Sequence, residues 1–137
     1  MREILLMIGL SISLFAELSK SENIVTDSRT GLQWQDNATP ATMNWNSAID
    51  YCEALILEQH TDWRLPNIRE LTSIMDDTKT NPSIDITVFV NIQPNRYWSS
   101  STVVKYPDYV TNVYFGDGSV VPDDKRSDYY VRCVREE

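Results

Sequence analysis

Residues 61–71 read Thr-Asp-Trp-Arg-Leu-Pro-Asn-Ile-Arg-Glu-Leu, and this stretch carries the clearest structural signals in the chain. Pro66 fixes its own φ and disfavours the α region for the residue before it, so the chain is expected to approach it in an extended conformation. Asn67 and Glu70 have the spacing of a capping box, in which each side chain binds the backbone N–H of the other residue. The stretch therefore predicts an extended segment followed directly by a helix.

The apolar residues of this stretch indicate that it is buried in the core. Trp63 and Leu65 share one face of an extended segment, and the residues that follow continue the apolar surface at helical spacing. We expect Arg64 to bind carboxylate or carbonyl acceptors in neighbouring loops, and Glu70 to close the helix cap. A catalytic or ligand-binding pair of Arg64 and Glu70 is the alternative. The residues predicted to be structural are Trp63, Arg64, Pro66, Glu70 and Trp98.

The patterns before and after this stretch predict a second helix and a hairpin. Gly31 can supply the turn between strands over residues 23–27 and 32–35. Asn44 can cap a helix, and Ile68–Met75 is expected to form the helix that follows the capping box. The apolar stripe of the helix after Asn44 contains Trp45, Ala48, Ile49, Cys52, Leu55 and Ile56.

The C-terminal half is predicted to be mainly strands. Residues 109–115 and 119–121 flank Gly116-Asp117-Gly118, which is a strong hairpin signal. Further strands are expected over residues 97–102, with Trp98 packed inward, and over residues 129–135. Residues 84–90 alternate in polarity between two prolines, which indicates either a short strand or a turn.

The composition fits a single domain and opposes a nucleic-acid partner. The chain has 137 residues, of which 42% are apolar, with four Trp and seven Tyr. This length suits one domain with one hydrophobic core. The formal net charge is −8, whereas affinity for polyanions depends on Lys and Arg that neutralise phosphates. We therefore expect no binding to nucleic acid.

Residues 1–19 resemble a signal peptide, and the folded domain is expected over residues 22–137. Arg2 precedes an apolar run that ends at Phe15 and is shorter than the roughly 20 residues of a membrane-spanning helix. We predict an exported protein that is secreted, periplasmic or on the cell surface, with no stable membrane span. An uncleaved anchor or an ordinary N-terminal helix is the alternative.

The two cysteines, Cys52 and Cys133, are predicted to form a disulfide. An even number of cysteines in an exported chain is typical of such pairing. Cys52 lies on the inward stripe of its helix, where a cysteine on a strand could meet it. Closing a loop of roughly 80 residues stabilises a fold by about 4–5 kcal/mol on the chain-entropy estimate. Two buried free thiols are the alternative.

Several ordered motifs carry a resemblance to a known family. They are residues 30–35 (Thr-Gly-Leu-Gln-Trp-Gln), 48–52 (Ala-Ile-Asp-Tyr-Cys), 62–66 (Asp-Trp-Arg-Leu-Pro) with Glu70-Leu71, 97–100 (Tyr-Trp-Ser-Ser) and 131–135 (Val-Arg-Cys-Val-Arg). Together they resemble the C-terminal domain family of the Legionella collagen-like protein. The resemblance implies a C-type lectin-like α+β fold, with two helices packed on a mainly antiparallel twisted β-sheet. It also implies a largely bacterial, often exported family whose first helix is tied to the last strand by a disulfide.

The resemblance implies non-catalytic recognition of a cell-surface glycan or another ligand. The namesake is an adhesin whose domain is associated with sulfated glycosaminoglycans. In this chain, however, the basic residues Lys105, Lys125 and Arg126 stand among acidic ones, so a neutral or amine-bearing ligand is expected instead. The alternative is a structural or protein–protein interaction module of the bacterial envelope that binds no sugar.

Aromatic residues of the β-rich half form the predicted ligand surface, because aromatic faces beside hydrogen-bond acceptors suit sugar rings and peptides alike. Ordinary packing within a sheet is the alternative. The predicted ligand-binding residues are Tyr106, Asp108, Tyr109, Asn112 and Tyr114.

Catalytic and metal sites have little support in the sequence. His60 is the only histidine, and with two paired cysteines it cannot complete a tetrahedral zinc site. Formylglycine-generating enzymes share a lectin-like fold but depend on reactive cysteines, so we expect no enzyme activity. Calcium is supported by no motif, since the Glu-Pro-Asn and Trp-Asn-Asp signatures of calcium-dependent lectins are missing. The weak candidates for calcium ligands are Asp117, Asp123, Asp124 and Asp128.

Overall fold

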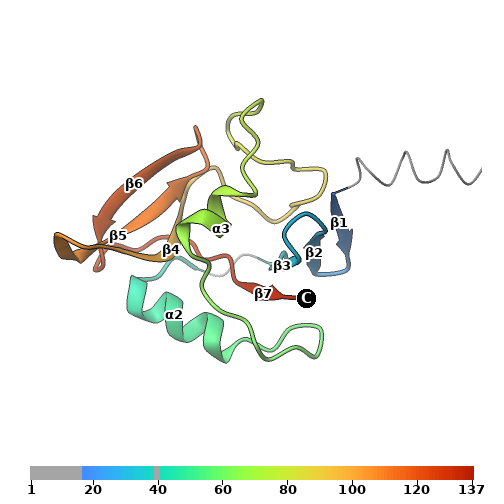
Figure 1. The fold of residues 1–137 in the computed structure, drawn as a ribbon, viewed down its shortest axis with the longest axis horizontal. Helices are drawn as coiled ribbons and strands as arrows, with labels where there is room; N and C mark the ends of the chain where they lie inside the picture. Colours follow the sequence, from blue (N-terminus) through green and yellow to red (C-terminus); the bar gives the residue numbers. More distant parts are fainter. Residues whose placement is uncertain (1–16, 39–40) are drawn as a thin grey trace, which may run out of the picture.

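The computed structural model describes residues 17–38 and 41–137, which form an α+β domain with two small antiparallel sheets (Figure 1). The strand order is β1-β2-β3-β7 in the first sheet and β4-β5-β6 in the second. Helix α3 lies between the two sheets in Figure 1. The elements are β1 (Leu18–Ser21), β2 (Ile24–Asp27), β3 (Leu32–Gln35), α2 (Trp45–Ala54), α3 (Ile68–Thr72), β4 (Arg96–Val103), β5 (Tyr106–Tyr114), β6 (Ser119–Asp124) and β7 (Val134–Glu136).

The prediction of two helices and mainly antiparallel strands is confirmed for the described residues, but the prediction of one sheet is wrong. Residues 129–133 were expected to belong to a long final strand. They instead make single bridges, Met43 with Tyr129 and Tyr97 with Tyr130, and regular pairing begins only at Val134. The C-terminal segment therefore runs between the sheets without merging them.

The predicted caps form, although both helices end earlier than predicted. The Asn44 side chain accepts a hydrogen bond from the Ser47 N–H at the start of α2, and Asn67 and Glu70 form the complete capping box of α3. Leu55 is already extended, so α2 ends at Ala54 and Ile56 is 71% exposed rather than on the inner stripe. The apolar periodicity of the sequence continues to Ile56, although the backbone leaves the helical conformation at Leu55.

Residues 84–90 form turns rather than a strand within the described chain. The Asp85 carboxylate accepts hydrogen bonds from both the N–H and the hydroxyl of Thr87, which closes a local turn. Ile84 and Phe89 are buried, whereas Ile86 lies exposed between them. The alternating polarity of this segment therefore reflects a loop that inserts separate side chains into the core.

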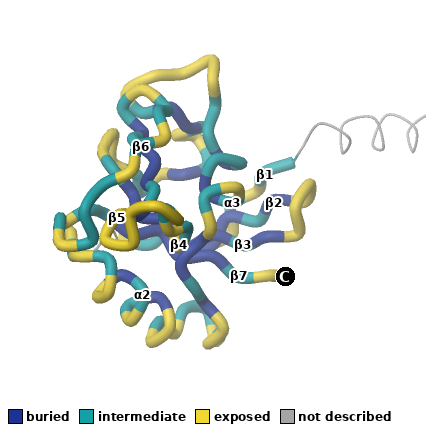
Figure 2. Tube along the Cα trace, turned by 60° about the vertical axis from the view of Figure 1, so that its left-hand side comes forward, coloured by how far each residue is buried: buried dark blue, intermediate teal, exposed yellow. Residues whose placement is uncertain are grey.

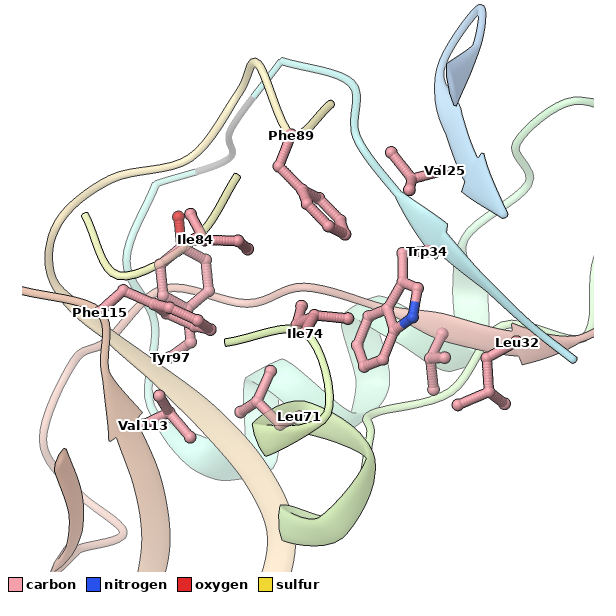
Figure 3. Packing of buried hydrophobic residues seen from close by; sticks show 11 residues of the cluster. Val25, Leu32, Trp34, Leu71, Ile74, Ile84, Phe89, Tyr97, Val113 and Phe115 are labelled. Carbon is pink, nitrogen blue, oxygen red and sulfur yellow. The ribbon is translucent and has the colours of Figure 1, made fainter. Parts of the chain in front are cut away.

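Two clusters of buried side chains lie on opposite faces of the second sheet. The first cluster joins Trp34 of β3 to Tyr97 and Val113 of the second sheet, with Leu71 of α3 between them (Figure 3). The second cluster contains Trp98 together with residues of α2 and of the stretch around Trp63. Figure 2 shows the buried segments meeting at the centre of the domain. The residues of the two clusters come from both sheets and both helices, so their packing joins these elements.

The predicted disulfide between Cys52 and Cys133 is present, with a Cα–Cα distance of 5.5 Å. Both cysteines are fully buried in the second cluster. Gln35 of β3 also holds Cys133 in place. Its N–H donates to the Cys133 carbonyl, and its side-chain oxygen accepts from the Cys133 N–H. The C-terminal segment is therefore held covalently to α2 and by hydrogen bonds to β3.

A buried ion network, which the sequence analysis missed, lies beside the disulfide. The Asp36 carboxylate is fully buried and accepts from Lys20 Nζ at 2.6 Å and from Arg132 Nη1 at 3.1 Å. It also accepts from the N–H groups of Val90 and Asn91, at 2.9 and 3.1 Å. The sequence analysis did not select Asp36, which follows the strand predicted over residues 32–35. Its carboxylate joins β1, the loop after β3, the 90–91 loop and the C-terminal segment.

The signal peptide predicted over residues 1–19 lies largely outside the described residues. Of this range, Leu18 and Ser19 belong to β1, and the Glu17 carbonyl accepts a hydrogen bond from the Ser28 N–H at 2.9 Å. In the portion of the chain that the structure describes, no helix has the length and apolar character needed to cross a membrane.

Replacing the buried carboxylate is expected to test the ion network. Asp36→Ala should lower the free energy of unfolding by about 3–5 kcal/mol, because it leaves the Arg132 guanidinium buried without its partner. Lys20→Met is the matched control and should cost less, because the Asp36 carboxylate keeps Arg132 and two backbone N–H donors. Urea unfolding measures both variants. Equal losses would show that Arg132 does not depend on Asp36.

Candidate functional site

The predicted ligand residues fall into two separate groups in the structure. Tyr106, Asp108 and Tyr109 are exposed at the start of β5, beside the turn that follows β4. Asn112 is fully buried further along the same strand, and Tyr114 is half-buried near its end. The structure therefore brings the first three residues together and does not bring Asn112 or Tyr114 to them.

We call residues 104–109 the hairpin tip. Tyr106 and Tyr109 are 62% and 42% exposed, and their ring centroids lie 6.2 Å apart with the planes tilted by 53°. Val104 beside them is 97% exposed. The sequence analysis did not select Val104, because a single apolar residue near a turn has no distinguishing pattern.

An irregular strand register explains how the two tyrosines meet. Val103 pairs with Tyr106 but Thr102 pairs with Val110, so residues 107–109 have no partners on β4. In a regular strand, residues three positions apart point to opposite faces. The extra residues bend the strand locally, as a β-bulge does, and place both rings on one side.

Two basic residues near the hairpin tip, Lys125 and Arg126, are engaged in contacts within the protein, whereas Lys105 within the tip is exposed. The Lys125 ammonium lies 4.6 Å from the centre of the Trp45 ring, and the Lys125 N–H donates to the Asp108 carbonyl. The Arg126 side chain donates to both oxygens of Asp124, at 3.0 and 2.7 Å, and lowers the pKa of that carboxyl to about 2. These contacts leave Lys125 and Arg126 poorly placed to bind a polyanion.

The weak calcium candidates are held apart by separate partners. Asp117 accepts from the N–H and hydroxyl of Ser119, which lower the pKa of its carboxyl, and Asp124 binds Arg126. Asp123 accepts from the Tyr129 hydroxyl, while Asp128 is exposed. Across residues 17–38 and 41–137, no three His, Cys, Asp or Glu side chains gather in a way that could hold a metal ion. Calcium binding at these four residues, for which the sequence has no motif, is not tested by these contacts.

Asn112, Tyr114 and Asp123 belong instead to a polar cluster with two residues that the sequence analysis missed, Arg96 and Tyr129. The Arg96 guanidinium carbon lies 5.7 Å from the centre of each tyrosine ring, and its Nη1 is 3.8 Å from Asp123 Oδ2. Burial is the main cause that raises the pKa of Tyr129, and the hydrogen bond to Asp123 raises it further. Only the strand register could reveal this grouping, because its members are far apart in sequence.

The stretch around Pro66 makes the contacts of a connector between elements. Both terminal nitrogens of Arg64 donate to the Glu70 carboxylate, at 2.7 and 2.8 Å, while the Arg64 backbone pairs with Val134. The Pro66 carbonyl accepts from the Ser100 N–H of β4. Trp63 is buried in the second cluster, as is Trp98, whose indole N–H donates to the Met43 carbonyl. These contacts join α3, β4 and the C-terminal segment.

Two grooves lie away from the hairpin tip. The larger, of about 460 Å³, is lined by Thr30, Gly31, Leu32, Arg69, Glu70, Ser73, Glu136 and Glu137. The smaller, of about 280 Å³, is lined by Glu17, Leu18, Arg29, Ser73, Ile74, Met75, Asp76, Asp77 and Asp85. Neither groove includes one of the predicted ligand-binding residues or calcium candidates, although Glu70, whose alternative role was ligand binding, lines the larger one.

The fold and contacts define a disulfide-bonded α+β domain that carries an exposed aromatic hairpin. The model of the Lcl C-terminal domain family matches residues 23–135. The chain belongs to this family, which confirms the resemblance seen in its motifs. No curated protein matched the chain. Strand β1 precedes the matched region.

The ion pair of Arg64 and Glu70 predicts a pH dependence of stability. The Arg64 guanidinium lowers the pKa of Glu70 in the folded state from its ordinary value of 4.5. The resulting stabilisation is present above the unfolded pKa and is lost as the pH falls through the lowered folded value. The free energy of unfolding should therefore decrease on acidification below about pH 4.5.

Glu70→Gln keeps a side chain that can close the capping box and removes the charge. It should cost about 1 kcal/mol at neutral pH and make the acid dependence of stability shallower. Urea unfolding at a series of pH values measures both effects. Glu53→Gln, at an exposed position of α2, is the control and should leave the slope unchanged. Identical slopes in both variants would contradict the role assigned to the pair.

Proposed function

We propose that this protein is an exported, non-catalytic recognition domain that binds a neutral or amine-bearing glycan through its hairpin tip. The observation that carries the proposal is the exposed pair of Tyr106 and Tyr109, whose rings lie 6.2 Å apart. Tyrosine rings present a flat apolar face and a polar hydroxyl, which suit the C–H faces and hydroxyl groups of sugars. A sugar ring is therefore expected to bind most favourably at the hairpin tip.

The position of the two rings supports a role in recognition over one in packing. The tyrosines of the core, Tyr97 and Tyr130, stack on each other inside the domain, with centroids 5.4 Å apart. Tyr106 and Tyr109 contact each other but remain open to solvent, together with the almost fully exposed Val104. Apolar groups gathered at the surface favour an interaction site.

The charges around the tip support a ligand that is not a polyanion. Lys125 and Arg126 are engaged by Trp45 and Asp124, and the whole chain has a net charge of −8. The exposed side chain of Asp108 can accept hydrogen bonds from sugar hydroxyls or from an ammonium group. Residues 104–109 offer a sulfated chain a single basic side chain, Lys105, beside the acidic Asp108, in a chain of net charge −8.

Two further features support export and the absence of catalysis. The disulfide between Cys52 and Cys133 is typical of an oxidising compartment, in agreement with the apolar leader pattern of residues 1–19. The same bond removes both thiols from nucleophilic chemistry. His60 lies in the loop after α2, where its backbone pairs with Leu57.

A protein–protein interaction module of the bacterial envelope is the second candidate. Val104 favours it, because a fully exposed apolar side chain without hydrogen-bonding groups suits a protein surface better than a sugar. This alternative predicts recovery of one specific envelope protein with the domain, and loss of that protein when Val104 becomes Ser. Glycan arrays would then show no saturable signal.

Substitutions at the hairpin tip test the glycan proposal. Tyr106→Ala and Tyr109→Ala should each weaken binding to the best array ligand by roughly 2–10-fold, the loss expected for one aromatic contact. Val120→Ala is the control, because Val120 is an exposed apolar residue on β6 outside the tip. Tyr114→Ala should also leave affinity unchanged if the tip alone binds ligand.

Affinity measured by titration calorimetry, with and without calcium, decides the outcome. Equal affinity of both tip variants and the unmodified protein would overturn the proposed surface. A requirement for calcium would direct attention back to Asp117, Asp123, Asp124 and Asp128. Thermal unfolding of every variant confirms that the fold is retained.

A further inference from the structure

The polar cluster on the second sheet contains buried groups without hydrogen-bond partners. Asn112 is fully buried, and neither its Oδ1 nor its Nδ2 has a partner in the part of the chain that the structure describes. The Nη1 atom of Arg96 is likewise buried without a hydrogen bond. A buried polar group left unpaired costs roughly 1–3 kcal/mol, so three such atoms together need an explanation.

The strand register places these groups beside one another on one face. Asn112 pairs with Trp98 on one side and with Val121 on the other. Arg96 lies two residues before Trp98, and Asp123 lies two residues after Val121. Arg96 and Asp123 are therefore diagonal neighbours of Asn112, on the two strands that flank β5.

The contact between Arg96 and Asp123 spans the strand that carries Asn112. Its N–O distance of 3.8 Å is an ion-pair distance but is too long for a hydrogen bond. Polar groups separated by more than about 3.5 Å are commonly bridged by water. The register places the Asn112 side chain on the same face of the sheet, on the strand between Arg96 and Asp123, and the Tyr129 hydroxyl donates to Asp123.

The unpaired atoms complement the hydrogen-bonding groups of water. Arg96 Nη1 and Asn112 Nδ2 are donors that need an acceptor, whereas Asn112 Oδ1 and the Asp123 carboxylate are acceptors. A water oxygen accepts two hydrogen bonds and its hydrogens donate two. The isolated indole N–H groups of Trp34 and Trp63 differ, because each is a single unpaired donor within an apolar cluster.

We propose that Arg96, Asn112 and Asp123 form a binding site for at least one ordered water molecule. The water accepts from Arg96 Nη1 and Asn112 Nδ2 and donates to Asp123, which closes the gap between β4 and β6 across β5. Buried waters typically make about three such bonds to groups that the protein leaves unpaired. The site assigns Asn112 and Asp123 to binding solvent within the sheet rather than to binding a sugar or a metal.

A crystal structure at about 1.5 Å resolution tests the site directly. We expect an oxygen within hydrogen-bonding distance of both Arg96 Nη1 and Asn112 Nδ2. Asn112 bonded entirely to protein groups, with no solvent density, would overturn the proposal. Density surrounded by carboxylate oxygens at about 2.3–2.6 Å would identify a calcium ion and would overturn it as well.

Oxygen-17 magnetic relaxation dispersion tests the site in solution by counting long-lived internal waters. Asn112→Leu should lose at least one such water relative to the unmodified protein. Tyr109→Ala, at an exposed position of the same strand, should lose none. Arg96→Met provides a second measurement if Asn112→Leu does not fold. An unchanged count in every folded variant would overturn the proposal, whatever the outcome of glycan binding.

Discussion

The covalent bond between Cys52 and Cys133 determines how the rest of this domain is arranged. It attaches α2 to the C-terminal segment at a residue that also exchanges hydrogen bonds with Gln35 of β3. The adjacent residue, Arg132, reaches the buried carboxylate of Asp36. A guanidinium and a carboxylate are costly to bury unless their geometry is maintained. The disulfide holds the backbone in the position where this ion pair is satisfied.

The same bond sets the register of a segment that has core on both sides. Tyr129, Val131 and Cys133 contact the second cluster, while Tyr130 and Val134 contact the first. A slip by one residue would exchange these faces and would move the Arg132 side chain away from Asp36. Two buried faces and one buried ion pair therefore permit a single register, and only short stretches of the segment need regular strand pairing.

The elements that sequence analysis predicted correctly depend on neighbours along the chain. The caps at Asn44 and Asn67, and the turn at Gly116–Gly118, each need only a few adjacent residues. The features it missed depend on pairing between distant segments. Asp36 was not selected because its partners lie on other elements. Asn112 was assigned to a ligand surface because its burial follows only from the β4–β5–β6 register.

The hairpin tip and the polar cluster around Asn112 differ in how much of the fold depends on them. At the hairpin tip, residues 107–109 have no partners on β4, so substitutions there disturb few contacts of the fold. Asn112 is fully buried on the central strand between β4 and β6, and a change there alters the sheet itself. Under the proposed function, recognition would diversify through the tyrosines of the tip while the sheet beneath it stays constant. This separation is what a binding domain needs if one scaffold is to present different surfaces.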